Sequence, residues 1–190
     1  MRAVNIYMEK NPNPNSMKFV VNFMLLQDGI SFDYPNAESA DDSPLAQELF
    51  KIEGVERVFY MSNFITVTKT ESIDWIELQD PIRAVIRPYL EEEEKPLILQ
   101  ELDKDPLFDE NDTEVVKQIK GILDEYIRPA VEQDGGAITF ASFQEGVVKV
   151  NLQGSCSGCP ASTVTLKSGI ENLLKRMLPN DVKEVVAEGV

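Results

Sequence analysis

Apolar and polar residues in the first half of the chain follow patterns that predict strands and two helices. Residues 4–8 and 17–25 have the composition of strands, and the prolines and asparagines between them favour a turn. Ser43 is a candidate N-cap and Pro44 suits the first helical position, ahead of apolar residues spaced along one helix face. Residues 55–60 and 64–68 are predicted strands, and residues 73–90 are a predicted helix that Pro81 would break or kink.

The second half predicts the order helix, strand, strand, helix, strand. Thr113 is a candidate N-cap before apolar residues at helical spacing. Asp134, Gly135 and Gly136 form a turn signal, because glycine takes positive φ readily. The later predicted elements are two strands joined as a hairpin, a helix and a final strand, at residues 137–143, 147–152, 161–177 and 182–187. The predicted core of this half is Val148, Val150, Leu152, Leu166, Ile170 and Leu173. The fold class is therefore α+β.

An acidic segment separates the two halves. Acidic residues accumulate from Glu91 to Asp112, and two prolines there oppose a continuous helix. We therefore expect two small α+β domains, at residues 1–90 and 113–190, joined by an acidic linker at residues 91–112. An extended chain over the last 18 residues of this linker would span roughly 60 Å.

The net charge of −15 removes the basic surface that nucleic-acid binding requires. No apolar run approaches the ~20 residues that span a bilayer, so no membrane partner is expected either. The first ten residues lack both the apolar core of a secretory signal and the arginine-rich character of an organellar presequence. These features predict a cytoplasmic protein.

The candidate chemistry is concentrated in two cysteines. The chain contains no histidine, so the commonest general base and the commonest nitrogen ligand for metals are both missing. Its two cysteines, Cys156 and Cys159, are spaced Cys-x-x-Cys just before a predicted helix. In a reducing compartment such a pair is more often metal-binding or redox-active than a structural disulfide.

The spacing alone leaves four interpretations open. Two thiolates fall short of the four that commonly hold an iron-sulfur cluster, but two chains together supply four. The pair is equally compatible with a thiol-disulfide oxidoreductase, with zinc shared between two chains, or with a structural or incidental pair. The sequence around the cysteines has to decide between them.

That surrounding sequence resembles a known family. Residues 127–131, 134–136, 152–160 and 165–167 look like the NifU-like domain of Nfu iron-sulfur scaffold proteins, and the likeness covers nearly all of residues 113–190. Residues 12–19, 43–46, 54–55 and 64–67 resemble the Nfu amino-terminal domain. One departure is Ala137, where many relatives carry an acidic residue.

The resemblance implies a scaffold or carrier rather than an enzyme, with no catalytic residue. It implies that Cys156 and Cys159 from each of two subunits hold a [4Fe-4S] cluster, rather than a [2Fe-2S] cluster, in a homodimer formed on loading. The implied partners are iron-sulfur assembly proteins and apo iron-sulfur client proteins. We further expect residues 134–136 to be a structural turn and Trp75 to pack within the first domain.

Overall fold

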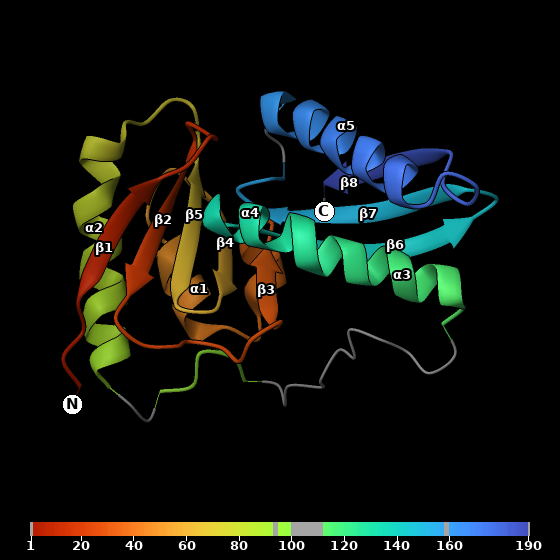
Figure 1. Cartoon of the computed structure of the whole chain (residues 1–190). Coiled ribbons are helices and arrows are strands. Elements are labelled where there is room, and N and C mark those ends of the chain that lie inside the picture. Colours follow the sequence, from red (N-terminus) through yellow and green to blue (C-terminus); the bar gives the residue numbers. More distant parts are fainter. Residues whose placement is uncertain (1, 93–94, 100–111, 158–159, 190) are drawn as a thin grey trace. The chain divides into compact units, whose positions relative to one another are not determined.

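The computed structural model describes residues 2–92, 95–99, 112–157 and 160–189, with side chains of residues 160–162 left aside. The chain divides into two units, Met1–Lys104 and Asp105–Val190. Both units combine helices with a sheet, so the predicted α+β fold class with two domains is confirmed (Figure 1).

The first unit contains a five-stranded antiparallel sheet in the order β1-β2-β5-β4-β3. Its strands are β1 (Ile6–Lys10), β2 (Ser16–Val21), β3 (Ser31–Tyr34), β4 (Val55–Met61) and β5 (Phe64–Lys69). Its helices are the 3-10 turn η1 (Ala37–Ala40), α1 (Pro44–Phe50) and α2 (Trp75–Glu91).

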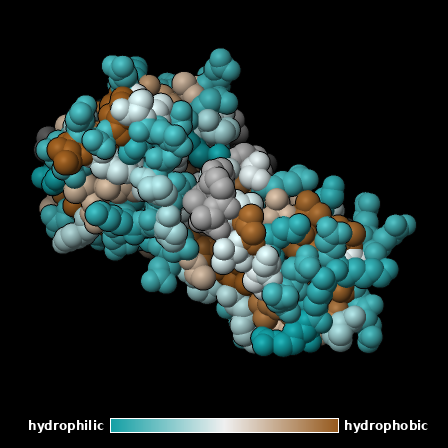
Figure 2. All heavy atoms as spheres, turned by 90° about the horizontal axis from the view of Figure 1, so that it is seen from above, coloured by the Kyte–Doolittle hydropathy of each residue, from teal (hydrophilic) through white to brown (hydrophobic). Residues whose placement is uncertain are grey.

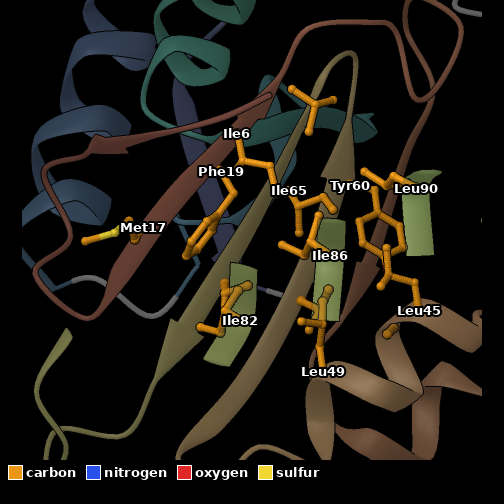
Figure 3. Packing of buried hydrophobic residues seen from close by; sticks show 14 of the residues in the cluster. Ile6, Met17, Phe19, Leu45, Leu49, Tyr60, Ile65, Ile82, Ile86 and Leu90 are labelled. Atoms are coloured by element: carbon orange, nitrogen blue, oxygen red, sulfur yellow. The ribbon is translucent and has the colours of Figure 1, made fainter. Parts of the chain in front are cut away.

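Helices α1 and α2 pack against one face of this sheet (Figure 1). Alternate residues of a strand point to opposite faces, so Phe19 and Ile65 reach the helices from neighbouring strands. Figure 3 shows these side chains among residues of α1, α2 and β4, all buried: Leu45, Leu49, Ile82, Ile86 and Tyr60. Burying each such apolar side chain contributes about 1.5–3 kcal/mol.

The helix α2 is continuous, contrary to the expectation that Pro81 would break or kink it. Both Pro81 and Pro88 lie inside the helix and are exposed on its outer face. Each proline costs the helix roughly 3 kcal/mol. The opposite face buries Leu78, Ile82, Ile86 and Leu90, which together contribute about 6–12 kcal/mol. Tertiary packing therefore outweighs the local penalty.

Residues 95–99 belong structurally to the first unit, although they fall within the predicted linker. Leu97 and Ile98 pack against its core. The N–H of Leu99 donates to the carbonyl of Asp42 at 2.7 Å, and the hydroxyl of Tyr89 donates to the carbonyl of Pro96 at 2.7 Å. The remaining linker up to residue 111 lies outside the described residues, apart from residues 91 and 92.

Ser43 joins three parts of the first unit. As predicted, it caps α1, accepting from the N–H of Ala46 at 3.3 Å. Its hydroxyl also lies 3.2 Å from that of Tyr60 and donates to the carbonyl of Leu97 at 3.0 Å. Burial raises the pKa of Tyr60, which keeps its hydroxyl protonated inside the core.

We predict that Ser43→Ala destabilises the chain by about 2–3 kcal/mol, because it removes a helix cap and strips the buried Tyr60 hydroxyl of a partner. Urea unfolding measures the change. Ser72→Ala, at an exposed serine, is the matched control and should change stability by less than about 0.5 kcal/mol. Equal stabilities for the two variants would contradict this account of Ser43.

The second unit contains a three-stranded sheet in the order β6-β7-β8, with β7 antiparallel to β6 and parallel to β8. Its elements are α3 (Glu114–Ile122), the π-helical η2 (Leu123–Ile127), α4 (Arg128–Gln133), β6 (Gly136–Gln144), β7 (Val147–Gly154), α5 (Pro160–Met177) and β8 (Glu184–Gly189). The predicted order of helix, strand, strand, helix and strand is confirmed.

The β6–β7 hairpin turns through Glu145 and Gly146, which both have positive φ, of 52° and 89°. Helices on both sides of the hairpin in sequence pack against one set of alternating β7 residues. Most of the predicted core is fully buried, namely Val148, Val150, Leu152 and Ile170, while Leu166 and Leu173 are partly buried. Core residues missed by the prediction include Ile119, Leu174 and Val185.

Glu171 connects α5 to β8. Its carboxylate accepts from Lys175 at 2.6 Å and from the backbone N–H of Val185 at 3.0 Å. These contacts, the first above all, lower the pKa of Glu171. The charged carboxylate therefore helps to fix the end of the cysteine-bearing helix relative to the sheet.

The helix α3–η2–α4 widens at η2. Leu123 within η2 is buried, as are Ile119 and Ile122 before it and Val131 after it. A π-type turn holds more residues than an α-helical turn, so it changes the angular register of everything that follows. The wide turn thus lets both ends of this long helix bury apolar side chains.

The surface carries separate exposed apolar side chains. On the face shown in Figure 2, hydrophobic residues are interspersed among hydrophilic ones. Ile76 and Val164 are the most exposed of the large apolar side chains in the described part of the chain, at 81% and 67%. Among the described helices, none is both long enough and apolar enough to cross a bilayer.

Candidate functional site

The candidate site begins where β7 ends. Gly154 closes the strand with a φ of 62°, as expected of a glycine that turns the chain toward the cysteines. Ser155, Cys156 and Ser157 follow, and α5 begins at Pro160. The predicted site residue Cys159 and its neighbour Gly158 lie outside the described residues, so only Cys156 can be placed.

The side chain of Cys156 is directed into the second unit. It is 3% exposed and belongs to the hydrophobic core with Leu152 and Ile170. The prediction assigned this core to apolar residues alone, whereas the sulfur is part of it. Cys156 therefore combines a packing role with its candidate ligand role.

Gly136 makes room for that sulfur. A Cβ atom at Gly136 would lie 2.9 Å from the Cys156 Sγ and 2.6 Å from the carbonyl oxygen of Gln153. Both distances are too short for real contacts, so any other residue at this position would displace the cysteine or the strand. Gly136 pairs with Gly154 at the open end of the β6–β7 hairpin, beside the cysteine loop.

Ser155 ties the cysteine loop to the turn before β6. Its hydroxyl donates to the carbonyl of Asp134 in a short hydrogen bond, and its backbone N–H donates to the carbonyl of Gly135 at 3.3 Å. The same hydroxyl lies 3.9 Å from the Cys156 Sγ. Gly135 has a φ of 80°, which confirms that residues 134–136 form a structural turn.

Sequence reasoning missed the roles of Gly136 and Ser155 toward the cysteine. The available signal was the pair of adjacent glycines, because one positive φ, at Gly135, is enough to make the turn. The second glycine then needs another reason, such as the close approach of another group. Nothing in the local sequence indicates that the approaching group is the thiol of Cys156, 20 residues away.

The chemistry available here is that of a thiol pair at the start of a long helix. The N-terminal end of an α-helix carries partial positive charge and favours anionic ligands such as thiolates. Within the described residues, no group of three or more Cys, Asp or Glu side chains is arranged to hold a metal ion. A metal centre at this site would therefore need ligands from elsewhere, such as a second chain.

In the first unit, Trp75 packs as predicted. It lies against the core, and its indole Nε1 donates to the carbonyl of Pro14 at 3.0 Å. The loop around Pro14 is held by its own side chains, since Asn11 Oδ1 accepts from the N–H of Asn13 and from the hydroxyl of Ser16. These contacts account for the loop's composition through turn geometry.

Comparison with known proteins gives the same two-part division. Residues 6–93 match the family model described as the N-terminal part of the scaffold protein Nfu/NifU, and residues 119–186 match the NifU-like domain. A solved NifU-like protein from Saccharomyces cerevisiae is 26% identical with a TM-score of 0.47, covering 53% of this chain and 89% of that one.

Two named relatives cover nearly the whole chain. The NFU1 iron-sulfur cluster scaffold homolog, mitochondrial, of Drosophila persimilis is 42% identical over 94% of this chain. NifU-like protein 5, mitochondrial, of Arabidopsis thaliana is 43% identical over 98% of this chain. The chain spans 63% of the length of the first relative and 69% of the second.

The prediction of a cytoplasmic protein is contradicted by these relatives, which are named mitochondrial. That prediction depended on the missing presequence, and a chain that spans only part of its relatives carries no information about a leader. The match to both family models in order, together with a relative 43% identical over 98% of the chain, shows that this protein belongs to the Nfu/NifU scaffold protein family.

Proposed function

We propose that this protein holds an iron-sulfur cluster as cargo between two copies of the chain and delivers it to apo iron-sulfur client proteins. Cys156 and Cys159 of each copy supply the four thiolates. The cluster is of the [4Fe-4S] type rather than [2Fe-2S]. The protein is a scaffold or carrier, with no catalytic residue and with iron-sulfur assembly proteins as its other partners.

The observation that carries this proposal is the position of the cysteine pair. The chain's only two cysteines lie in the matched NifU-like domain, at the end of β7 and the start of α5. With no histidine in the chain, a tetrahedral all-thiolate set requires a second copy. Relatives that align with nearly the whole chain are named iron-sulfur cluster scaffolds.

Delivery follows from thiolate exchange. Each client cysteine thiolate forms one Fe–S bond as one carrier thiolate leaves its iron, so four exchanges move the cluster without a net redox change. We propose that residues 113–190 carry the cluster, that residues 1–90 help to recognise donors or clients, and that residues 91–112 connect the two.

The leading rival is a thiol-disulfide oxidoreductase. Such an enzyme attacks its substrate with an accessible thiolate. Cys156 is 3% exposed and packed in the core, which argues against that role. A zinc-bridged dimer is the second rival, because it would use the same four thiolates.

Anaerobic reconstitution with iron and sulfide, followed by metal and sulfide assays, separates these candidates. A shared [4Fe-4S] cluster gives about two iron and two sulfide per chain, whereas a shared [2Fe-2S] cluster gives about one of each. Shared zinc gives about half a zinc per chain and no sulfide. A chain that takes up no iron or sulfide, yet turns over disulfides with a reducing partner, would contradict the proposal.

A further inference from the structure

We propose that Gly136 and Ser155 are positioning residues that hold Cys156 in a closed, buried position in the cluster-free chain, and that the cysteine loop must open before a cluster can bind. The closed position is a property of the described residues alone. The opening step rests on the proposed function.

The first support is the shape of the site around Gly136. The Cys156 Sγ occupies the space that a Cβ at Gly136 would fill, at 2.9 Å. The backbone N of Cys156 lies 3.2 Å from the same point, so the backbone as well as the sulfur fits against this glycine. The sulfur is thus held in a recess of the β6–β7 hairpin.

The second support is the anchoring of the loop by Ser155. Ser155 is 2% exposed and is hydrogen-bonded to the turn at Asp134 and Gly135 through both its hydroxyl and its N–H. The next residue but one, Ser157, has its N–H on the carbonyl of Gly154 at 3.1 Å. Hydrogen bonds on both sides of Cys156 therefore keep the loop folded over the recess.

A cluster shared by two chains cannot reach the sulfur in this position. Iron must come within bonding distance of the sulfur, about 2.3 Å for a metal–thiolate bond, and the cluster must at the same time contact the other chain. A side chain that is 3% exposed, inside its own core, meets neither requirement. The cysteine side chain is short, so the backbone of the loop has to move outward.

The closed position also has a chemical consequence. Thiols react with oxidants and alkylating reagents when they are exposed as thiolates, and buried cysteines are inert. The recess should therefore protect Cys156 while the carrier is empty, and opening should be needed both for modification and for loading.

The test measures thiol reactivity in the full chain carrying Cys159→Ser, so that Cys156 is its single thiol. Iodoacetamide alkylation, followed by mass spectrometry, should be at least about tenfold slower in the folded chain than in urea. Adding Gly136→Ala should raise the folded-state rate about tenfold or more, because the new Cβ expels the sulfur. Ser155→Ala should raise it in the same direction.

Gly146→Ala is the matched control. It strains the same hairpin at its opposite end, where φ is 89°, and does not touch the cysteine. If Gly146→Ala speeds alkylation as much as Gly136→Ala, the effect is one of general stability and the proposal is overturned. If Gly136→Ala fails to fold by circular dichroism, Ser155→Ala decides the outcome, and an unchanged rate there overturns the proposal.

The opening step is tested with both cysteines restored. Gly136→Ala should then load its cluster faster than the parent chain, as followed by visible absorbance, and a rate no faster than the parent's overturns the gating step. Failure of the proposed function is distinguishable, because the parent chain itself would then take up no cluster while the alkylation results stand unaffected.

Discussion

Replacing either Cys156 or Cys159 by serine is expected to abolish stable cluster binding. Each substitution removes one thiolate per chain and hence two of the four in a dimer. A neutral hydroxyl is a poor substitute for a soft anionic sulfur ligand of iron. Iron content and visible absorbance after anaerobic reconstitution should therefore fall to background in both variants.

The two variants should differ in stability. Cys156 is a member of the core, so Cys156→Ser buries a hydroxyl in an apolar site and should cost about 1–3 kcal/mol. Cys156→Ala removes the ligand without introducing a polar group and is the better control for folding. A folded single variant that keeps a normal, stable cluster would remove that cysteine from the ligand set. Collapse of the apo fold in both alanine variants would instead favour a structural role for the pair.

Loading is expected to produce a species of twice the chain mass of 21.4 kDa. One chain supplies two thiolates and no histidine, so a four-coordinate set can be completed only by a second copy. Light scattering coupled to anaerobic gel filtration measures the mass of the coloured species. Removing the cluster with an iron chelator should abolish that species.

Small thiols have to be excluded from the experiment. Dithiothreitol or glutathione can occupy two iron sites and leave a loaded monomer. The sample should therefore be desalted before measurement and compared with one containing added thiol. A stable loaded monomer in the absence of any external thiol would contradict a cluster bridged by four protein cysteines.

Much of the fold follows from local signals. Ser43 and Thr113 cap their helices because a side-chain oxygen at the N-cap meets an otherwise unpaired N–H within the same few residues. The Glu145–Gly146 turn is equally local, since two adjacent residues with positive φ join two predicted strands. Such features depend on neighbours in sequence and are visible without the tertiary structure.

Features that depend on distant residues could not be predicted. The strand β3 was missed, and it is held at the sheet edge by an ion pair between Asp33 and Arg57 at 2.6 Å. The 95–99 segment resembled linker because the partners of its backbone, such as Asp42, lie far away in sequence. For the same reason, the motif identified Cys156 as a candidate ligand but gave no sign that its sulfur rests against Gly136.

The wide turn at η2 has a consequence for insertions and deletions. Removing one residue from Leu123–Ile127 would restore an ordinary α-helix but rotate everything after it by about 100°. Val131 would then leave the core, and Asp134, whose carbonyl accepts the Ser155 hydroxyl, would move away from the cysteine loop. A length change of one residue in this helix, with no altered side chain near the cysteines, should therefore disturb the cysteine loop, whereas the exposed ends of the chain should tolerate such changes.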